Sequence, residues 1–304
     1  MYLEHFGLRE YPFTLTPDTS YFLANSHHQA ALNTLLVAIS TGEGFIKITG
    51  EVGTGKTLLC RQFLAHIEHI NATQPTPQFV TAYIPNPYLT PHSLMLALAE
   101  ELGFSPAANI EQHQLLKSIT QALLACANQG QQVILCLDEA QAMPIETLEA
   151  LRLLTNLETE KRKLLQIILL GQPELDQKLQ HHSIRQLNQR ISFHYQLGTL
   201  NLAELGQYVA HRLHTAGYQG PPVFTRRALQ ALHHASGGIP RLINILAHKA
   251  MMLSFGTGEY QIGARQISIA AEDTEAAQQI VHYRYYLAIA FIMLATGFGW
   301  VILK

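Results

Sequence analysis

The sequence predicts an α/β protein in which a parallel β-sheet is sandwiched by helices, followed by a small all-helical domain and a C-terminal transmembrane helix. Strand-like and helix-like runs alternate between residues 45 and 197. A glycine-rich loop joins the first of these strands to its helix. Beyond residue 200 strand-like runs nearly disappear, and the chain closes on an apolar stretch. Such alternation is typical of parallel sheets that are covered by helices on both faces.

Apolar periodicity places the elements in order along the chain. A loop rich in proline and aromatic residues opens the chain, and a helix follows near 26–40. The expected strands are 45–49, 79–84, 133–137, 164–170 and 191–197. The expected helices follow the glycine-rich loop and lie near 91–102, 111–128, 145–159, 201–216, 226–236 and 239–254. We therefore expect a sheet domain at 1–199, a helical lid domain at 200–270, a linker at 271–284 and a membrane helix at 285–303.

The last of these segments reads YYLAIAFIMLATGFGWVIL and carries no charge. A helix of this length measures about 28 Å, close to the thickness of the hydrocarbon core. Tyr285 and Trp300 lie near its two ends, where aromatic side chains favour the membrane interface. A buried core helix is the alternative, but such a helix usually keeps a polar stripe. We expect a single membrane span, one residue before the chain ends.

Composition narrows the functional classes. Charged residues make up 14% of the chain, and the net charge is −2. The sequence shows no stripe of basic residues of the kind that would indicate nucleic-acid binding. The N-terminus lacks the basic and apolar regions of a cleavable signal peptide. Cys60, Cys126 and Cys136 form no Cys-x-x-Cys pair, which favours buried thiols in a reducing compartment.

Residues 50–57 read GEVGTGKT and match the phosphate-binding P-loop, Gly-x-x-x-x-Gly-Lys-Thr. Glycine accepts positive φ without strain, so successive backbone N–H groups can curl around an anion. Lys56 is expected to reach the terminal phosphates, and Thr57 to offer its hydroxyl to Mg²⁺. A glycine-rich surface turn is the alternative, but the preceding strand and the following helix favour a P-loop. The residues expected to bind nucleotide are Gly50, Glu51, Val52, Gly53, Thr54, Gly55, Lys56, Thr57 and Leu58.

Two acidic residues follow the apolar strand at 133–137. In P-loop enzymes an acid at this place binds Mg²⁺, and we assign that role to Asp138. Glu139 is placed to orient and polarise the attacking water. The next strand ends near Gln172, which is expected to touch the γ-phosphate or the water. Gln172 is equally well explained as a polar turn residue before Pro173.

Three arginines are candidates for stabilising the transition state. Arg185 and Arg190 precede the last strand, where an arginine can cross a subunit boundary as a finger. Arg190 is slightly favoured, and a salt-bridged surface residue is the alternative for either. Arg241 opens a helix of the small domain and is expected to sense the γ-phosphate, rather than being a plain surface arginine.

Taken together, these motifs resemble the AAA+ ATPases. More closely, they resemble the ExeA/GspA general secretion group and its relatives in pilus assembly of the mannose-sensitive haemagglutinin (MSHA) type. The resemblance rests on FGLREYPF…TPD, GEVGTGKT, LDEAQ, LEALRLLTNLET, LLGQPEL, RQLNQRI and GGIPRLIN, and it covers most of the chain. The order and spacing of these motifs are more specific than any one of them.

The resemblance implies an ATPase that uses ATP and Mg²⁺ and forms a ring-type homo-oligomer with an arginine finger supplied in trans. It implies an anchor in the bacterial inner membrane, an ATPase domain on the cytoplasmic face, and envelope or pilus assembly proteins as partners. Members of the secretion group continue into a peptidoglycan-binding domain. This chain stops one residue after the expected span, which favours the type IV-like pilus branch over the type II secretion apparatus.

Two other functions stay open. One is a DNA-binding AAA+ ATPase of the transposition or replication-initiator type, against which the near-neutral charge counts. The other is a nucleotide-bound scaffold with little hydrolysis, against which the intact pair of Asp138 and Glu139 counts.

Overall fold

A computed structural model of the chain describes residues 2–16, 18–23, 25–107, 110–158 and 163–279. The chain divides into two compact units. Residues 26–198 form one, called here the sheet unit, and residues 1–25 with 199–304 form the other, called the helical unit. The expected membrane segment at 285–303 lies outside the described residues. Within the described ranges, no helix is both long and apolar enough to cross a membrane.

The sheet unit is built on five parallel strands in the order β2-β3-β4-β1-β5. Their bounds are β1 Phe45–Gly50, β2 Phe79–Ile84, β3 Gln132–Leu137, β4 Leu165–Gly171 and β5 Phe193–Leu197. All five expected strands are confirmed, with ends shifted by at most two residues. A parallel sheet requires a crossover between strands, and each crossover here carries helix.

Side chains of the central strands alternate between two apolar cores because successive residues of a strand point to opposite faces. On β1, Phe45 packs in one core and Ile46 in the other; on β4, Ile167 and Ile168 divide in the same way. The continuous apolar runs of β3 and β4 therefore serve two faces at once. This arrangement confirms the predicted sheet with helices on both sides.

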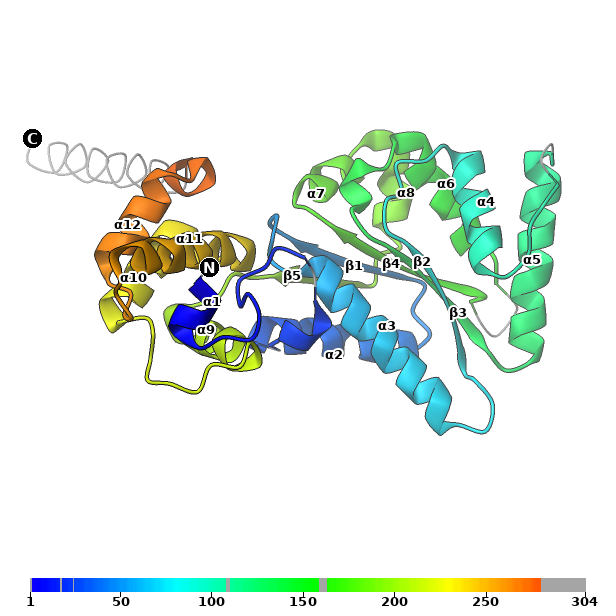
Figure 1. Cartoon of the computed structure of the whole chain (residues 1–304). Helices are drawn as coiled ribbons and strands as arrows, with labels where there is room; N and C mark the ends of the chain where they lie inside the picture. The colour runs from blue at the N-terminus through cyan, green and yellow to red at the C-terminus, as the bar shows by residue number, and fades with distance from the viewer. Residues whose placement is uncertain (1, 17, 24, 108–109, 159–162, 280–304) are drawn as a thin grey trace, which may run out of the picture. The chain divides into compact units, whose positions relative to one another are not determined.

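Helices cover both faces of the sheet (Figure 1). One face carries α2 Ser26–Ser40 and α3 Lys56–Thr73. The other carries α4 Pro91–Glu101, α5 Gln112–Asn128, α6 Ile145–Thr155, α7 Glu174–Leu179 and α8 Arg185–Asn188, with the 3₁₀ turns η2 Ala140–Ala142 and η3 His182–Ile184. The short helices α7 and α8 were not among the expected elements. A helix of one or two turns shows too little periodicity to be recognised in a sequence.

The strand register brings three chain segments to one edge of the sheet. Thr49 of β1 pairs with Gly171 of β4, and Leu137 of β3 pairs with Leu169 of β4. The glycine-rich loop and the acidic pair after β3 therefore flank the residue that follows β4. Ligands of open α/β sheets bind outside the carboxyl ends of the strands.

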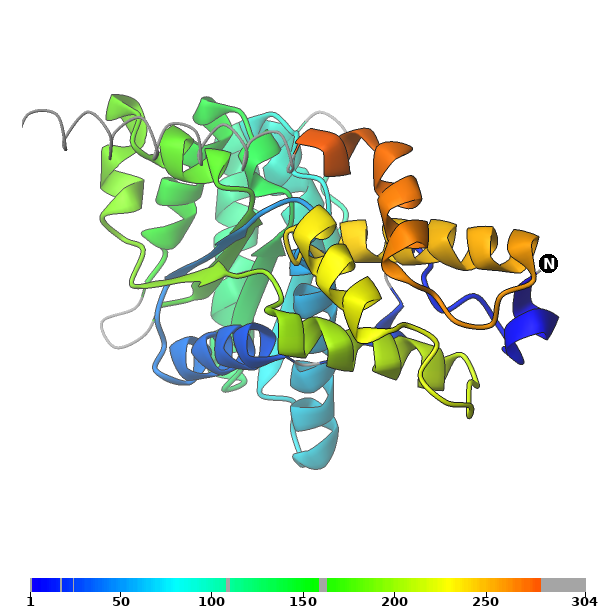
Figure 2. The same cartoon turned by 90° about the vertical axis from the view of Figure 1, so that its left-hand side faces the viewer.

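The helical unit has a core of its own. Its helices are α1 Tyr2–Phe6, α9 Leu202–Thr215, α10 Arg226–Ser236, α11 Pro240–Thr257 and α12 Ala264–Glu272, with the 3₁₀ turn η1 Thr19–Tyr21. In Figure 2 the helices coloured from yellow to orange pack side by side, and the blue N-terminal segment runs along them. Asn201 and Glu204 form a capping box at the N-terminus of α9, and the Thr225 side chain caps the N-terminus of α10.

Residues 1–25 belong to the helical unit, which differs from the expected sheet domain at 1–199. Tyr2, Phe6 and Phe13 are buried in the helical core. The guanidinium of Arg212 on α9 donates to the carbonyl oxygen of Pro12 and, at 3.0 Å, to the hydroxyl of Tyr208. Burial of these aromatic rings holds the segment on the helices, and a sequence pattern does not reveal such a long-range partner.

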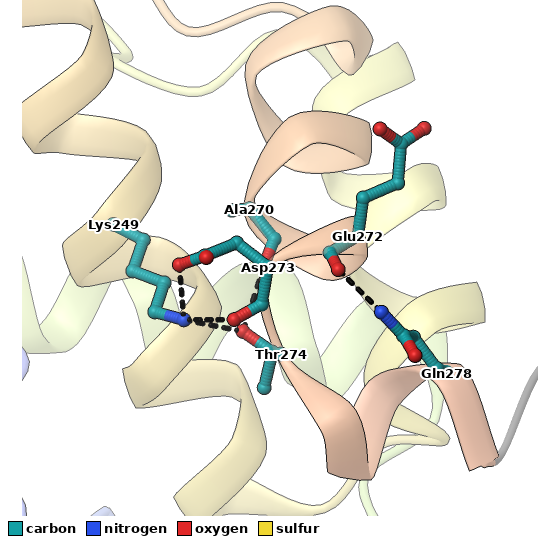
Figure 3. Close-up of polar contacts among 6 residues, drawn as sticks. All are labelled: Lys249, Ala270, Glu272, Asp273, Thr274 and Gln278. Atoms are coloured by element: carbon teal, nitrogen blue, oxygen red, sulfur yellow. Dashed lines mark hydrogen bonds and ion pairs between the residues drawn. The ribbon is translucent and has the colours of Figure 1, made fainter.

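The described part of the expected linker at 271–284, residues 271–279, packs with the helical unit. Helix α12 continues to Glu272, and Ala277 is buried in the helical core. Figure 3 shows Lys249 of α11 reaching the end of α12. Its ammonium donates to the backbone oxygen of Asp273 at 2.6 Å, to the Asp273 carboxylate at 2.8 Å and to the Thr274 hydroxyl at 2.8 Å. The cation thereby caps the last turn of α12.

Candidate nucleotide site

The glycine-rich loop adopts the backbone that its composition predicts. Gly53 and Gly55 have φ of 82° and 97°, in the left-handed region that disfavours other residues. A β-carbon on Gly55 would also lie 2.8 Å from the Nε2 atom of His28 on α2. Thr54 is buried, and its hydroxyl donates to the carbonyl oxygen of Glu51 at 2.8 Å, which holds the loop in its curl.

Helix α3 begins directly after this loop, and no side chain caps its N-terminus. The first N–H groups of a helix have no partner within the helix, and its dipole favours an anion there. A phosphate at this position receives backbone donors without any charged side chain. Glu51 and Val52 are exposed at the mouth of the loop, and Leu58 is half-buried on the first turn of the helix.

Lys56 is buried with its ammonium turned onto its own loop. It donates to the carbonyl oxygens of Gly50 at 2.7 Å and Glu51 at 2.9 Å. Burial lowers the pKa of Lys56, and the nearby carboxylates of Glu139 and Asp138 oppose that shift. A buried cation that is satisfied by backbone carbonyls is prepared for a stronger anionic partner, which phosphate oxygens provide.

Thr57 and Asp138 meet at the predicted metal position. The Thr57 hydroxyl donates to Oδ2 of Asp138 at 2.6 Å, and the backbone N–H of Glu139 donates to Oδ1 at 2.9 Å. Asp138 is 2% exposed, and burial raises its pKa, although these two hydrogen bonds oppose the rise. A hydroxyl and a carboxylate beside a phosphate cradle are oxygen donors of the kind that Mg²⁺ takes.

Tyr83 was not predicted from the sequence. It lies on β2 opposite Cys136, and its hydroxyl approaches Oδ2 of Asp138 at 3.5 Å. Burial raises the pKa of Tyr83 well above its usual value, and the Asp138 charge adds to the effect. The sequence shows Tyr83 only as a tyrosine one residue before the end of a strand. Its proximity to Asp138 can be predicted only when β2 is known to lie beside β3.

Glu139 has a positive φ of 54°, which no other non-glycine residue shows among the described ranges. Its Oε2 atom accepts a hydrogen bond from the amide of Gln172 at 3.1 Å and another from the amide of Gln141. Gln172 was predicted to lie at this edge, and the structure brings it to Glu139. Strained backbone at a polar edge of a sheet is found most often at functional sites.

The three arginines lie on different elements. Arg190 is exposed, yet its guanidinium donates to the Thr155 hydroxyl at the end of α6 at 2.8 Å. Arg185 begins α8 and is exposed. Arg241 is the second residue of α11 and is exposed in the helical unit. Their roles toward a nucleotide stay predictions.

Known proteins resemble this chain in sequence and in fold. A family profile described as an AAA domain matches residues 39–179. General secretion pathway protein A from Aeromonas hydrophila is 40% identical over 304 aligned residues, which cover 99% of this chain and 54% of that protein. The chain thus spans about half the length of the curated relative that it matches.

Solved structures share the fold. The ORC2 protein of Aeropyrum pernix, in ADPNP–ADP complexes, matches with a TM-score of 0.61 at 17% identity, over 82% of this chain and 67% of that chain. The ORC1 protein of the same organism, in complex with DNA, matches with a TM-score of 0.62 at 17% identity, over 86% and 69% of the two chains. At such identity the likeness concerns the fold alone.

Proposed function

We propose that the chain, which is 40% identical to general secretion pathway protein A and matches an AAA domain profile, belongs to the same family and is an ATPase that supports assembly of a bacterial envelope machine. One observation supports the proposal above the others. Lys56, the pair of Thr57 and Asp138, and the pair of Glu139 and Gln172 converge at the carboxyl edge of one sheet. Phosphate binding, metal binding and activation of water each need one of these groups.

Binding begins at the loop. The backbone N–H groups from Gly53 to Thr57 surround the phosphates, and the Lys56 ammonium leaves the carbonyl oxygens of Gly50 and Glu51 to contact them. Thr57 and Asp138 would hold Mg²⁺, which when bound neutralises charge on the phosphate oxygens. The Thr57 hydroxyl, which donates to Asp138 at 2.6 Å in this structure, would be one of the oxygen donors to that ion.

Hydrolysis depends on Glu139. Its carboxylate accepts a proton from the attacking water, and the Gln172 amide contacts the γ-phosphate or that water. An arginine of a neighbouring subunit completes the site in a ring-type homo-oligomer. Arg185 and Arg190 are the candidates for this role, and Arg190 stays the favoured one; its guanidinium donates one hydrogen bond to Thr155 in this structure. Arg241 keeps its predicted role as a sensor of the γ-phosphate.

The proposed place of action is the inner membrane. Residues 285–303 form the anchor, and the ATPase faces the cytoplasm, where ATP is available. Partners are assembly proteins of the envelope, of a type IV-like MSHA pilus or a type II secretion apparatus. The name of the relative, general secretion pathway protein A, supports the secretion assignment. A reporter fused after Lys304 tests the topology, and a cytoplasmic reporter contradicts it.

Glu139→Gln tests the enzymatic proposal. The change removes the base and keeps the size of the side chain, so phosphate release should fall at least about 100-fold while ATP affinity changes by less than about threefold. Glu146→Gln is the matched control, since Glu146 is exposed on α6. Turnover of the Glu139 variant near that of the wild type would remove Glu139 from the mechanism.

A further inference from the structure

Gln141 lies two residues after Glu139, in the 3₁₀ turn η2, and both ends of its side-chain amide are bonded. Its Oε1 atom accepts the backbone N–H of Gln172 at 2.9 Å. Its Nε2 atom donates to Oε2 of Glu139. Gln141 thus connects Glu139, the second residue after β3, with Gln172, the residue after β4, and these two strands are neighbours in the sheet.

The orientation of this amide follows from its partners. A backbone N–H is a donor, so the Gln141 atom that faces it must be the carbonyl oxygen. The other end of the amide, an NH₂ group, then faces Glu139. Gln141 is therefore a donor to the carboxylate, and its bond to the main chain of Gln172 sets its orientation.

Helix α7 holds the backbone of the same turn. The Lys178 ammonium donates to the carbonyl oxygens of Gln141 and, at 3.0 Å, of Met143. Lys178 is half-buried, and two carbonyls on one ammonium fix the position of η2 relative to α7. The main chain and the side chain of Gln141 are thus each fixed by a separate partner.

The side-chain amides of Gln141 and Gln172, which both donate to Glu139, have different roles in the proposed reaction. The Gln172 amide is 3.1 Å from Oε2, and the proposed function requires it to turn toward the γ-phosphate or water. The Gln141 amide has no such second role and stays on Oε2. Both of these bonds are to Oε2, and among the described residues the structure records no hydrogen bond to Oε1 of Glu139.

We propose that Gln141 is a positioning residue for Glu139: it holds Oε2 and thereby presents Oε1 to the attacking water. This inference rests on the proposed ATPase function and deepens it. A glutamate side chain free to rotate samples several rotamers, and a base displaced by about 1 Å loses on the order of 100-fold in rate. Gln141 acts through Glu139 and does not itself contact the reacting atoms.

Gln141→Glu removes the donor and keeps an acceptor for the Gln172 N–H group. Gln141→Met removes both functions at similar length. We expect kcat to fall about 30-fold in each, a part of the value of a positioned base, with ATP affinity within about threefold of the wild type. Gln177→Met on the exposed side of α7 is the matched control. Retained nucleotide affinity establishes that each variant is folded.

A double-mutant cycle separates positioning from packing. In a Glu139→Gln background the Gln141→Met change should lower the residual single-turnover rate less than about twofold, because the group through which Gln141 acts is already lost. An equal loss in both backgrounds, or a loss confined to KM, would overturn the inference. If the wild-type protein releases no phosphate from ATP, the proposed function itself is contradicted. If the wild type hydrolyses ATP and the Gln141→Glu variant does so equally fast, only the inference about Gln141 is contradicted.

Discussion

The carboxyl edge of the sheet unit and the core of the helical unit both bury polar side chains, but the partners of those side chains differ. At the sheet edge Lys56 bonds to carbonyls of its own loop and Thr57 bonds to Asp138. Under the proposed function, a magnesium–nucleotide complex would replace these partners. In the helical unit Arg212 bonds to segments far away in the chain, among them Pro12. Burial of a polar group therefore indicates function only when its present partner is replaceable.

The two units also differ in which residues have positive φ. In the described part of the helical unit, positive φ occurs at glycines, including Gly238, where a β-carbon would meet the carbonyl oxygen of Leu200 at 2.1 Å. In the sheet unit Glu139 takes a positive φ although it has a side chain. The helical unit thus places glycine where its turns require it, whereas the sheet unit keeps strain beside the proposed water site.

The largest effect on stability is expected at Arg212. Arg212→Met leaves the carbonyl oxygen of Pro12 and the Tyr208 hydroxyl without their buried donor, which should lower the free energy of unfolding by about 3 kcal/mol. ATP affinity of the folded fraction should be unchanged. Chemical denaturation with Arg227→Met, an exposed position on α10, as control measures the difference. Unchanged stability of Arg212→Met would contradict the structural role assigned here to the buried polar groups of the helical unit.

A smaller effect of opposite sign is expected at Glu139. Glu139→Gly relieves the strain of a left-handed residue, so the nucleotide-free protein should gain about 1 kcal/mol of stability while losing turnover. Glu139→Ala, which loses the same carboxylate but keeps a β-carbon, is the control and should gain less. Equal stability of the two variants would show that the backbone at this position is not strained.

The smallest effect is expected at Lys249, where α12 ends. Hydrogen bonding to Lys249 lowers the pKa of Asp273 below its ordinary 3.8. A lowered carboxyl pKa stabilises the fold above the unfolded value and ceases to do so as pH falls through the folded value. Thermal midpoints should therefore be slightly lower for Lys249→Met at pH 7. The gap to the wild type should narrow below pH 3.8, and a gap that widens on acidification would contradict this.

The elements and site residues that a local sequence pattern determines were predicted correctly in position. The strands follow from periodicity, and the loop at 50–57 follows from its motif. Asp138, Glu139 and Gln172 were predicted from their places after strands, and they lie with the loop at the carboxyl edge of the sheet. Gln141 and Tyr83 were missed because their partners lie on neighbouring strands, and strand order is not written in any one segment. The N-terminal segment was placed in the wrong unit for a similar reason, since its partner Arg212 follows about 200 residues later.

The central claim is that a magnesium-bound triphosphate sits against the loop that precedes Lys56. Isothermal titration calorimetry of MgATP into the folded, full-length protein tests it most directly. We expect saturable heat with a dissociation constant between about 1 μM and 1 mM, as for substrates of most enzymes, and no such heat for a folded Lys56→Ala variant. Folded wild-type protein that gives no heat at millimolar MgATP would contradict the account.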